Sequence, residues 1–360
     1  MSASDPADAR FMALALSLGR RGLGRVWPNP AVACVIVKDG RIIGRAHTAD
    51  GGRPHAEPQA LAMAGADARG ATAYVTLEPC AHHGQTSPCA TALIAVGIAR
   101  VVVATGDPDP RVAGRGIAML QAAGITVDLG CLQTQAQADH AGFLLRITRN
   151  RPFVTLKLAL SLDGRIATAT GQSQWITGPQ ARRAVHMLRA RHDAVMIGAG
   201  TARADDPLLT VRGLGISHQP VRVVVSAGLN LPPDGALARS ARDVPLWLCH
   251  GPDADPTPWL ALGADCLRCD PFDMAQVMTS LATRGLTRVL CEGGGQIAAS
   301  LLQAGLVDEL VVFSAGLALG ADGISGVAAM GLTELAKAPH FSLISATQVG
   351  ADTMQVWRPL

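Results

Sequence analysis

The stretch that decides the fold begins with His55-Ala56-Glu57 and ends with Pro79-Cys80-Ala81-His82-His83-Gly84-Gln85-Thr86-Ser87-Pro88-Cys89. The imidazole of His55 and the thiolates of Cys80 and Cys89 offer three protein ligands for one Zn²⁺ ion. Three ligands leave the fourth tetrahedral position open for water, which a catalytic zinc site requires and a structural zinc site does not. The spacing therefore predicts a catalytic zinc centre.

Glu57 is the predicted proton shuttle of this centre. A carboxylate beside zinc-activated water can collect its proton and hand it to a ring nitrogen and then to a leaving amine. His-x-Glu followed by Pro-Cys-x-x-Cys is the signature of zinc deaminases, although here eight residues separate Cys80 from Cys89. A competing interpretation, that the ligands are unrelated core residues, does not account for both motifs in this order.

Two other classes of protein could carry the same motif. A nucleic-acid deaminase would need a basic surface and aromatic residues for stacking, whereas the net charge is +3 and aromatic residues make up 3%. A structural zinc module would need a fourth protein ligand, which His82 or His83 could supply. Metal stoichiometry measured together with activity would discriminate the structural module from an enzyme.

The chain is long enough for two domains, because 360 residues exceed the size at which a single core stops growing. A polar helical segment ending in Arg149-Asn150-Arg151-Pro152 is the predicted connection, with domains expected at residues 1–147 and 148–360. The eight cysteines are scattered, the apolar run at 11–18 has the wrong flanks for an export signal, and no apolar run reaches the length of a membrane span. We expect a cytoplasmic protein without nucleic-acid or membrane partners.

Strands alternate with helices in residues 1–147, which predicts a layered α/β domain. The sequence pattern predicts helices at 5–21, 54–63, 88–96 and 111–123, and strands at 31–37, 41–47, 71–77, 100–105 and 125–129. Both groups of zinc ligands fall near predicted helix N-termini, where the helix macrodipole favours thiolate and hydroxide.

The segment 153–162 opens the second half as an alternating strand. One face carries Val154, Leu156, Leu158, Leu160 and Leu162, and the other carries Thr155, Lys157, Ala159 and Ser161. An unpaired ammonium is costly to bury, so Lys157 in the middle of such a strand indicates a residue aimed into a polar cleft. The alternative is a strand face open to solvent.

Two glycine-rich segments follow predicted strands in this half. Gly198-Ala199-Gly200 ends a strand at 193–198, and Gly293-Gly294-Gly295 lies between a strand and a helix. Free backbone N–H groups and the positive end of a helix can hold a pyrophosphate, although either segment alone could be an ordinary turn. Together with Lys157 they favour a phosphate-bearing cofactor.

These residues carry a resemblance to the RibD family of bifunctional riboflavin biosynthesis proteins over nearly the whole chain. The matching motifs are Pro28-Asn-Pro30, His55-Ala-Glu57, 76–84, Asp107-Pro-Asp-Pro110, Val112-Ala-Gly-Arg-Gly116, Leu160-Ser-Leu-Asp-Gly164, Ser173-Gln-Trp-Ile-Thr177, 204–212 and 302–309. The long interval between the two cysteines is also typical of this family.

The resemblance implies a cytidine-deaminase-like three-layer α/β/α domain followed by a dihydrofolate-reductase-like α/β domain. The first would remove the exocyclic amine from 2,5-diamino-6-(5-phosphoribosylamino)pyrimidin-4-one with Zn²⁺. The second would then reduce the ribosyl group to ribityl with NADPH, giving 5-amino-6-(5-phosphoribitylamino)uracil. The implied partners are this small phosphoribosyl pyrimidine and further copies of the chain, as a homo-oligomer.

The resemblance also implies site residues beyond the zinc ligands and Glu57. The implied substrate contacts of the deaminase are Asn29, His47 and His82. In the reductase, the implied cofactor positions are Ala159, Trp175, Thr201, Asp205, Gly294, Gly295, Gln296, Ile297, Ala298, Ala299 and Ser300. The implied substrate positions there are Ser173, Arg189, Leu209, Arg212 and Glu292.

Lys157 and Asp205 are the candidates for polarising or protonating the opened sugar while hydride arrives at its C1′. Arginines suit the ribose phosphate, because their fork matches phosphate oxygens. Three positions depart from the family pattern: Gln85 replaces a basic residue, Ala33 replaces a glycine, and the loop 294–300 has a variant sequence.

Overall fold

The computed structural model describes residues 5–82 and 87–360, and these residues divide after Asn150 into two compact units. The boundary expected after residue 147 lies inside the last helix of the first unit, which ends at Arg149 and is followed by Asn150 in the left-handed conformation. Among the described residues, no helix combines the length and the apolar character that a bilayer crossing requires.

The first unit contains five helices and five strands in its described residues. The helices are α1 (Pro6–Gly19), α2 (Ala56–Ala64), α3 (Cys89–Val96), α4 (Arg115–Ala122) and α5 (Gln133–Arg149). The strands are β1 (Ala33–Lys38), β2 (Arg41–His47), β3 (Thr72–Val75), β4 (Arg100–Val103) and β5 (Thr126–Leu129). Short 3₁₀ helices cover Arg20–Gly22, Asp50–Gly52 and Gly65–Ala68.

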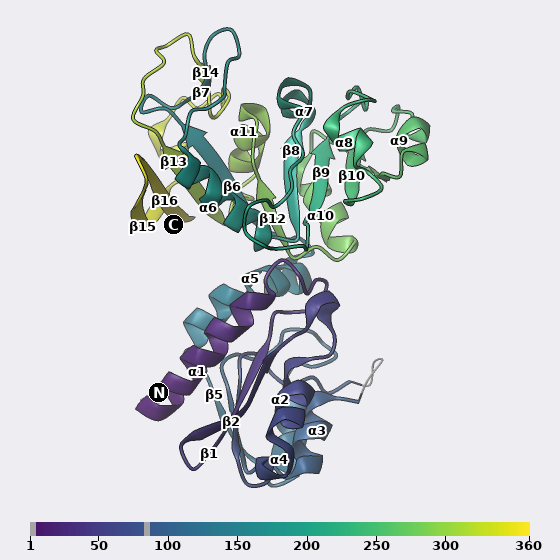
Figure 1. Ribbon diagram of the computed structural model, residues 1–360, viewed down its shortest axis with the longest axis vertical. Helices are drawn as coiled ribbons and strands as arrows, with labels where there is room; N and C mark the ends of the chain where they lie inside the picture. The colour runs from purple at the N-terminus through teal and green to yellow at the C-terminus, as the bar shows by residue number, and fades with distance from the viewer. Residues whose placement is uncertain (1–4, 83–86) are drawn as a thin grey trace. The chain divides into compact units, whose positions relative to one another are not determined.

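The strands form one sheet in the order β2-β1-β3-β4-β5, in which β1 runs antiparallel to β2 and β3 and the remaining pairs are parallel. Side chains on a strand alternate between the two faces of the sheet. On β1, Val35 and Val37 pack in a cluster with α1 and α5, whereas Cys34 and Ile36 pack in a cluster with α2, α3 and α4. The result is a three-layer α/β/α arrangement (Figure 1).

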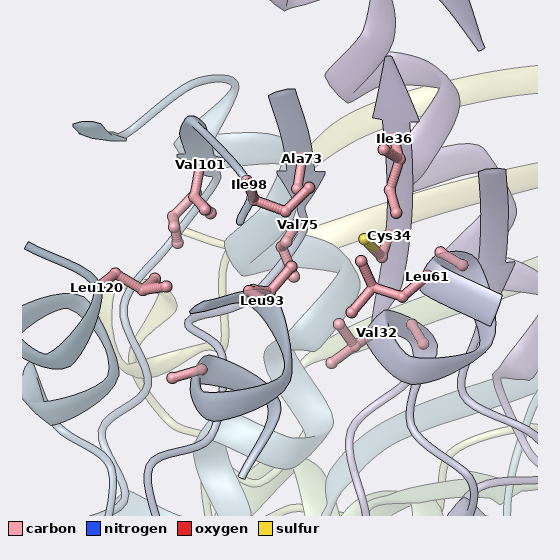
Figure 2. Packing of buried hydrophobic residues seen from close by; sticks show 14 of the residues in the cluster. Val32, Cys34, Ile36, Leu61, Ala73, Val75, Leu93, Ile98, Val101 and Leu120 are labelled. Carbon is pink, nitrogen blue, oxygen red and sulfur yellow. The ribbon is translucent and has the colours of Figure 1, made fainter. Parts of the chain in front are cut away.

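The layer that carries the sequence motif is packed almost entirely with aliphatic side chains. Figure 2 shows Leu61 of α2 and Leu93 of α3 against Cys34 and Val75 of the sheet. Leu93 is completely buried, and burying such a side chain contributes about 1.5–3 kcal/mol. This packing fixes the positions of the N-termini of α2 and α3, where His55 and Cys89 lie.

The second unit contains six helices and eleven strands. The helices are α6 (Pro179–Ala190), α7 (Ala199–Asp205), α8 (Ala236–Arg239), α9 (Thr257–Ala261), α10 (Met274–Thr283) and α11 (Gly295–Gln303), with a 3₁₀ helix at Leu335–Lys337. The strands are β6 (Phe153–Leu160), β7 (Arg165–Ala167), β8 (Ala194–Gly198), β9 (Val221–Val225), β10 (Leu246–His250), β11 (Asp265–Arg268), β12 (Arg288–Cys291), β13 (Glu309–Ser314), β14 (Ile324–Ser325), β15 (Phe341–Val349) and β16 (Asp352–Pro359).

Nine of these strands form one sheet in the order β11-β10-β9-β8-β12-β6-β13-β16-β15. The pairs from β11 to β13 are parallel, and β16 and β15 add an antiparallel hairpin at one end. Neighbouring side chains such as Val195 and Met196 are both buried although they point to opposite faces. Helices therefore cover both faces of the parallel part, as buried parallel strands require.

The prediction for 153–162 differs from the structure at its end. Strand β6 stops at Leu160, and the next residues turn toward β7, so that Leu162 is 72% exposed instead of lying on the apolar face. The turn is closed by side-chain bonds, because the Ser161 hydroxyl donates to Asp163 and accepts from the Arg165 N–H. Local hydrogen bonding of this kind competes with strand extension.

Candidate functional sites

The first unit brings His55, Cys80 and Cys89 together, with their ligand atoms within 4.8 Å of one another. The Nδ1 atom of His55 lies 3.4 Å from the Cys89 sulfur and 3.7 Å from the Cys80 sulfur. Zinc–nitrogen and zinc–sulfur bonds at a tetrahedral angle would separate these atoms by about 3.6 Å. The donor set and its spacing therefore fit Zn²⁺.

Local structure explains why these side chains converge. His55 is the residue immediately before α2, and Cys89 is the first residue of α3, so both lie at positive helix ends. The Cys89 N–H also donates to the Cys80 sulfur at 3.3 Å. The side-chain amide of Gln59 donates to the carbonyl oxygens of His47, Pro54 and His55, each at 2.9 Å, which holds the approach to α2.

Glu57 lies beside this ligand group and is almost fully buried, with 3% of its surface exposed. Burial raises the pKa of its carboxyl group, while its interactions with His55 and Cys89 work in the opposite direction. A raised pKa makes the carboxylate a better proton acceptor, which suits a group that takes up and returns protons.

The three predicted substrate contacts of this unit are each partly buried, and two of them, Asn29 and His47, form side-chain hydrogen bonds with the protein. Asn29 donates from Nδ2 to the Gly52 carbonyl at 3.1 Å, and His47 Nδ1 lies 2.9 Å from the Thr48 carbonyl. The Nδ1 atom of His82 is buried and has no hydrogen-bond partner among the described residues. Of the three predicted contacts, His82 is therefore the residue with a buried polar atom that is available to a ligand.

The alternative of a fourth protein ligand depended on His82 or His83. In the described part of the chain, the group that could hold a metal consists of His55, Cys80 and Cys89, and it does not include His82. His83 lies outside the described residues, as does Gln85.

Glu78 is a structural residue that lies in the 76–84 motif but received no role from the sequence. Its buried carboxylate accepts hydrogen bonds from the N–H groups of Asp107, Gly114, Gly116 and Ile117, at 3.0 to 3.3 Å. These bonds tie the segment 107–117 to the chain just before Cys80. A buried carboxylate needs such donors, but their positions could not be read from the sequence, since they lie about 30 to 40 residues away.

The second unit contains an open cleft with a volume of about 1180 Å³ at the C-terminal ends of β6, β8, β9 and β12. Ligands bind at this edge of parallel sheets in α/β folds. The sequence-predicted residues that line it are Lys157, Ala159, Ser173, Trp175, Arg189, Thr201, Asp205, Leu209, Arg212, Glu292, Gly294, Gly295, Gln296, Ile297 and Ser300. Ala298 and Ala299 do not line the cleft, because α11 turns their side chains into the core, where they are 0% and 4% exposed.

Lys157 projects from β6 into this cleft and is partly buried. Burial lowers the pKa of its ammonium group, and the negative charge of Glu292 partly offsets that effect. The environment of Lys157 is therefore the polar cleft predicted for it rather than an open strand face.

Arg189 and Glu292 line the same cleft and are bonded to each other. The Nε atom of Arg189 lies 2.5 Å from Oε1 of Glu292, and Nη2 lies 2.9 Å from Oε2. Burial alone would raise the pKa of Glu292, but the positive charges of Arg189 and Lys157 outweigh burial and lower it. Glu292 is therefore an anion in the folded protein.

Asp205 and Ser173 approach each other across the cleft, with the Ser173 hydroxyl 3.5 Å from Oδ1 of Asp205. Partial desolvation raises the pKa of Asp205, whereas Ser173 and Lys157 lower it. Thr201 accepts a hydrogen bond from the Gly294 N–H at 3.1 Å, which joins the two glycine-rich segments. The structure thus places both segments in one cleft with Lys157 and Asp205.

Comparisons with known proteins identify both halves of the chain. Residues 6–105 match the model of the cytidine and deoxycytidylate deaminase zinc-binding region, and residues 152–355 match that of the RibD C-terminal domain. The riboflavin biosynthesis protein RibD of Escherichia coli is 43% identical, over 96% of this chain and 97% of its own length. The chain belongs to the RibD family.

Solved structures of RibD-family proteins agree in fold. A RibD structure from Acinetobacter baumannii has a TM-score of 0.90 at 38% identity, and a deaminase/reductase from Thermotoga maritima has a TM-score of 0.89 at 34% identity. Each comparison covers 98% of this chain and 99% of the other. The predicted fold classes, cytidine-deaminase-like and dihydrofolate-reductase-like, are confirmed, and this RibD-family chain is an enzyme of riboflavin biosynthesis with zinc and NADPH as its cofactors.

Of the three departures from the RibD-family pattern, Ala33 is structurally harmless. Its side chain points into the cluster formed with α1, on the opposite face of the sheet from His55 and α2. The methyl group of Ala33 faces Gly19 of α1. Even a Cβ atom built on Gly19 would lie 3.7 Å from this methyl group, which is an ordinary van der Waals distance.

The cleft of this RibD-family chain also contains residues that the sequence motifs missed. These are Arg182, His186, Arg203, Ser226, Asn230 and Phe272. Arg182 and His186 could have been found from the sequence, because steps of four and then three residues along one helix connect them to Arg189. Arg203 lies between the predicted cofactor residues Thr201 and Asp205, whereas Ser226, Asn230 and Phe272 come from separate segments whose proximity depends on the order of strands in the sheet.

Proposed function

We propose that the first unit deaminates 2,5-diamino-6-(5-phosphoribosylamino)pyrimidin-4-one and that the second unit reduces the ribosyl group of the product to ribityl. The observation that carries the proposal is the convergence of His55, Cys80, Cys89 and Glu57 in one unit, and of Lys157 with two glycine-rich segments in the other. The Thermotoga maritima relative is named as a diaminohydroxyphosphoribosylaminopyrimidine deaminase and 5-amino-6-(5-phosphoribosylamino)uracil reductase.

In the deaminase, His55, Cys80 and Cys89 would hold the zinc ion. Zinc with three protein ligands supplies a Lewis acid that makes water nucleophilic near neutral pH. Glu57 would take a proton and deliver it to the ring nitrogen beside the amino-bearing carbon, and then to the departing amine. Its burial next to the metal ligands supports this role, because a shuttle must reach both partners without exchanging its proton with bulk water.

Asn29, His47 and His82 would contact the pyrimidine nucleotide. Asn29 is bonded to Gly52, in the segment that leads into His55. His47 is linked to His55 through Gln59, whose side-chain amide donates to the carbonyl oxygens of both residues. His82 offers a buried Nδ1 atom that has no partner among the described residues. A buried polar atom without a partner is costly, so a substrate hydrogen bond would satisfy it.

In the reductase, NADPH supplies the hydride that reaches C1′ of the sugar. Lys157 would donate a hydrogen bond or proton to the oxygen of the opened sugar, and Asp205 would assist as the second titratable group. Ala159, Trp175 and Thr201 would position the cofactor with the segment 294–300. Ala298 and Ala299 could act there only through their backbone, because their side chains lie in the core.

Arg212 would bind the ribose phosphate of the substrate together with Ser173 and the Leu209 segment. Arg212 is exposed in the cleft, and its backbone N–H lies 3.3 Å from His186 Nδ1. Arg189 and Glu292 would shape the substrate site as a pair, because their charged groups form an ion pair with each other.

We also propose that the enzyme acts as a homo-oligomer in the cytoplasm and has no nucleic-acid partner. The outermost strand β15 presents Leu343 and Ile344, which are 50% and 53% exposed, on a sheet edge. An apolar sheet edge favours pairing with another chain. The eight cysteines are free thiols, as a reducing compartment maintains them.

The proposed function is tested by incubating the purified protein with the diaminopyrimidine nucleotide, with and without NADPH. Ammonia release without NADPH, followed by ribityl product only when NADPH is added, is the expected result. A Glu57→Gln variant should accumulate neither product, whereas a Lys157→Met variant should accumulate the deaminated intermediate. Reduction in the Glu57→Gln variant without prior deamination would contradict the order of the two steps.

A further inference from the structure

The cleft of the second unit extends well beyond the residues assigned to the reaction. Lys157 lies on β6, whereas Ser226 and Asn230, which also line the cleft, follow β9. Three strand spacings separate β6 from β9, through β12 and β8. Since neighbouring strands lie about 4.8 Å apart, the two ends of the cleft are about 14 Å from each other.

The glycine-rich segments lie between these ends, at the termini of β12 and β8. A pyrophosphate at this midpoint would place one nucleoside of a dinucleotide toward β6 and the other toward β9. The direction in which the dinucleotide lies rests on the proposed function, because that function requires the hydride to arrive beside Lys157. The nicotinamide therefore belongs at the β6 end and the adenosine at the β9 end.

Arg203 is the arginine that the structure places at the β9 end. It lies on α7, which packs against both β8 and β9, and its Nη1 donates to the Asn230 carbonyl at 3.0 Å. The side chain is exposed, lines the cleft and forms no ion pair with any described carboxylate. One bond to a carbonyl orients the guanidinium and leaves its other N–H groups available.

Two other arginines of the cleft, Arg189 and Arg182, already have partners within the protein. Arg189 is paired with Glu292, and the guanidinium of Arg182 lies 4.5 Å from the centre of the Trp175 ring and donates to the Thr177 carbonyl. Phe272, 82% exposed at the cleft wall, offers an apolar surface for a base near the β9 end.

We propose that Arg203 binds the 2′-phosphate of the adenosine ribose and makes the reductase prefer NADPH to NADH. The two cofactors differ only in this phosphate, so discrimination requires a group that meets it. A guanidinium matches phosphate oxygens with two parallel N–H donors. Ser226, which directly follows β9, is a second polar residue of the cleft wall at this end.

The test measures binding rather than turnover. Dissociation constants for NADP⁺, NAD⁺ and 2′,5′-ADP are measured by calorimetry on the full chain and on Arg203→Ala. We expect Arg203→Ala to weaken NADP⁺ and 2′,5′-ADP about 10- to 100-fold, as loss of a charged hydrogen-bonding group does, and to change NAD⁺ less than about twofold. Arg203→Lys should recover part of the loss, because it keeps the charge without the fork.

Arg242→Ala is the matched control. Arg242 is also exposed and donates to one main-chain carbonyl, that of Ala261 at 2.9 Å, but it does not line the cleft. Its substitution removes the same charge and should leave both affinities unchanged.

Three outcomes would overturn the assignment of Arg203: equal affinity of the wild type for NADP⁺ and NAD⁺, an unchanged preference in Arg203→Ala, or equal weakening of both cofactors in that variant. Failure of the reductase assignment itself would be distinguishable, because the wild type would then bind neither NADP⁺ nor 2′,5′-ADP. An affinity gap that narrows as salt is raised would support a charge-based contact.

Discussion

Arg189 and Glu292 form a two-pronged ion pair in the wall of the reductase cleft, with contacts of 2.5 and 2.9 Å. Their side chains are only 12% and 9% exposed, and a third bond joins Arg189 to the Thr210 carbonyl. The two residues come from α6 and from the end of β12, about a hundred positions apart. The pair therefore links two elements of the cleft and provides the negative charge that faces Lys157.

Breaking this pair on one side should be costly. Arg189→Met leaves the Glu292 carboxylate buried without its partner, and we expect a loss of about 3–5 kcal/mol in the free energy of unfolding. The double variant Arg189→Met/Glu292→Gln should recover much of that loss, because no unpaired charge remains. Urea denaturation of the four members of this cycle measures the coupling. Equal stability of the single and double variants would show that the pair does not act as a unit.

Replacing Glu57 by Ala should abolish ammonia release while zinc remains bound. The expected loss in rate is about 10²- to 10⁴-fold, since a positioned acid–base group contributes that much. Zinc content by atomic absorption separates a lost shuttle from a lost metal, and reduction of independently prepared deaminated substrate serves as the control. Undiminished deamination in Glu57→Ala would refute the shuttle assignment.

Replacing Arg212 by Ala should weaken binding of the reductase substrate and leave deamination unchanged. Loss of a charged hydrogen bond to phosphate predicts an increase of about 10- to 100-fold in KM. Arg183→Ala is the control, because Arg183 lies on α6 and contacts the Gly213 carbonyl but does not line the cleft. A reductase KM that stays the same in Arg212→Ala would place the phosphate elsewhere.

Replacing Gly116 by Ala should disturb the zinc site from outside it. A Cβ on Gly116 would lie 2.0 Å from the Pro79 carbonyl oxygen, one residue before Cys80. We expect the backbone to shift, with a loss of about 1–3 kcal/mol in stability and weaker zinc retention against a chelator. Gly106→Ala, whose Cβ would have its nearest neighbour at 3.8 Å, should be tolerated. Full zinc retention in Gly116→Ala would contradict this account.

Asp107 should make stability depend on pH. Burial, with repulsion from Asp109 and Glu78, raises its pKa from 3.8 to about 6 in the folded protein. The folded state then holds the proton more tightly than the unfolded state, so this residue lowers stability as pH rises from about 4 to about 6. Asp107→Asn keeps the oxygen that accepts the Asp109 N–H and removes the charge.

The variant should therefore be more stable than the wild type by about 1–3 kcal/mol above pH 7, and the difference should shrink toward pH 4. Calorimetric unfolding of both proteins across this range measures the difference. A gain that does not change with pH would mean that charge is not its cause.

The sequence predicted the chemistry of the first unit because its reacting groups sit in short motifs whose spacing is set by local structure. His55 and Glu57 are two residues apart at the start of a helix, and Cys80 and Cys89 are nine residues apart in the sequence. The alternation of residues 153–160 likewise placed Lys157 on the face opposite the leucines, because strand periodicity is a local property.

Tertiary structure decided which side chains distant in the sequence interact with each other. Arg189 and Glu292 read as two separate substrate contacts, but the order of strands brings them into one ion pair. Glu78 gathers backbone donors from 107–117, and Arg203 meets the segment after β9, through contacts that no local pattern encodes. Local periodicity fixes the face on which a residue lies, whereas its partner depends on which strands become neighbours when the sheet assembles.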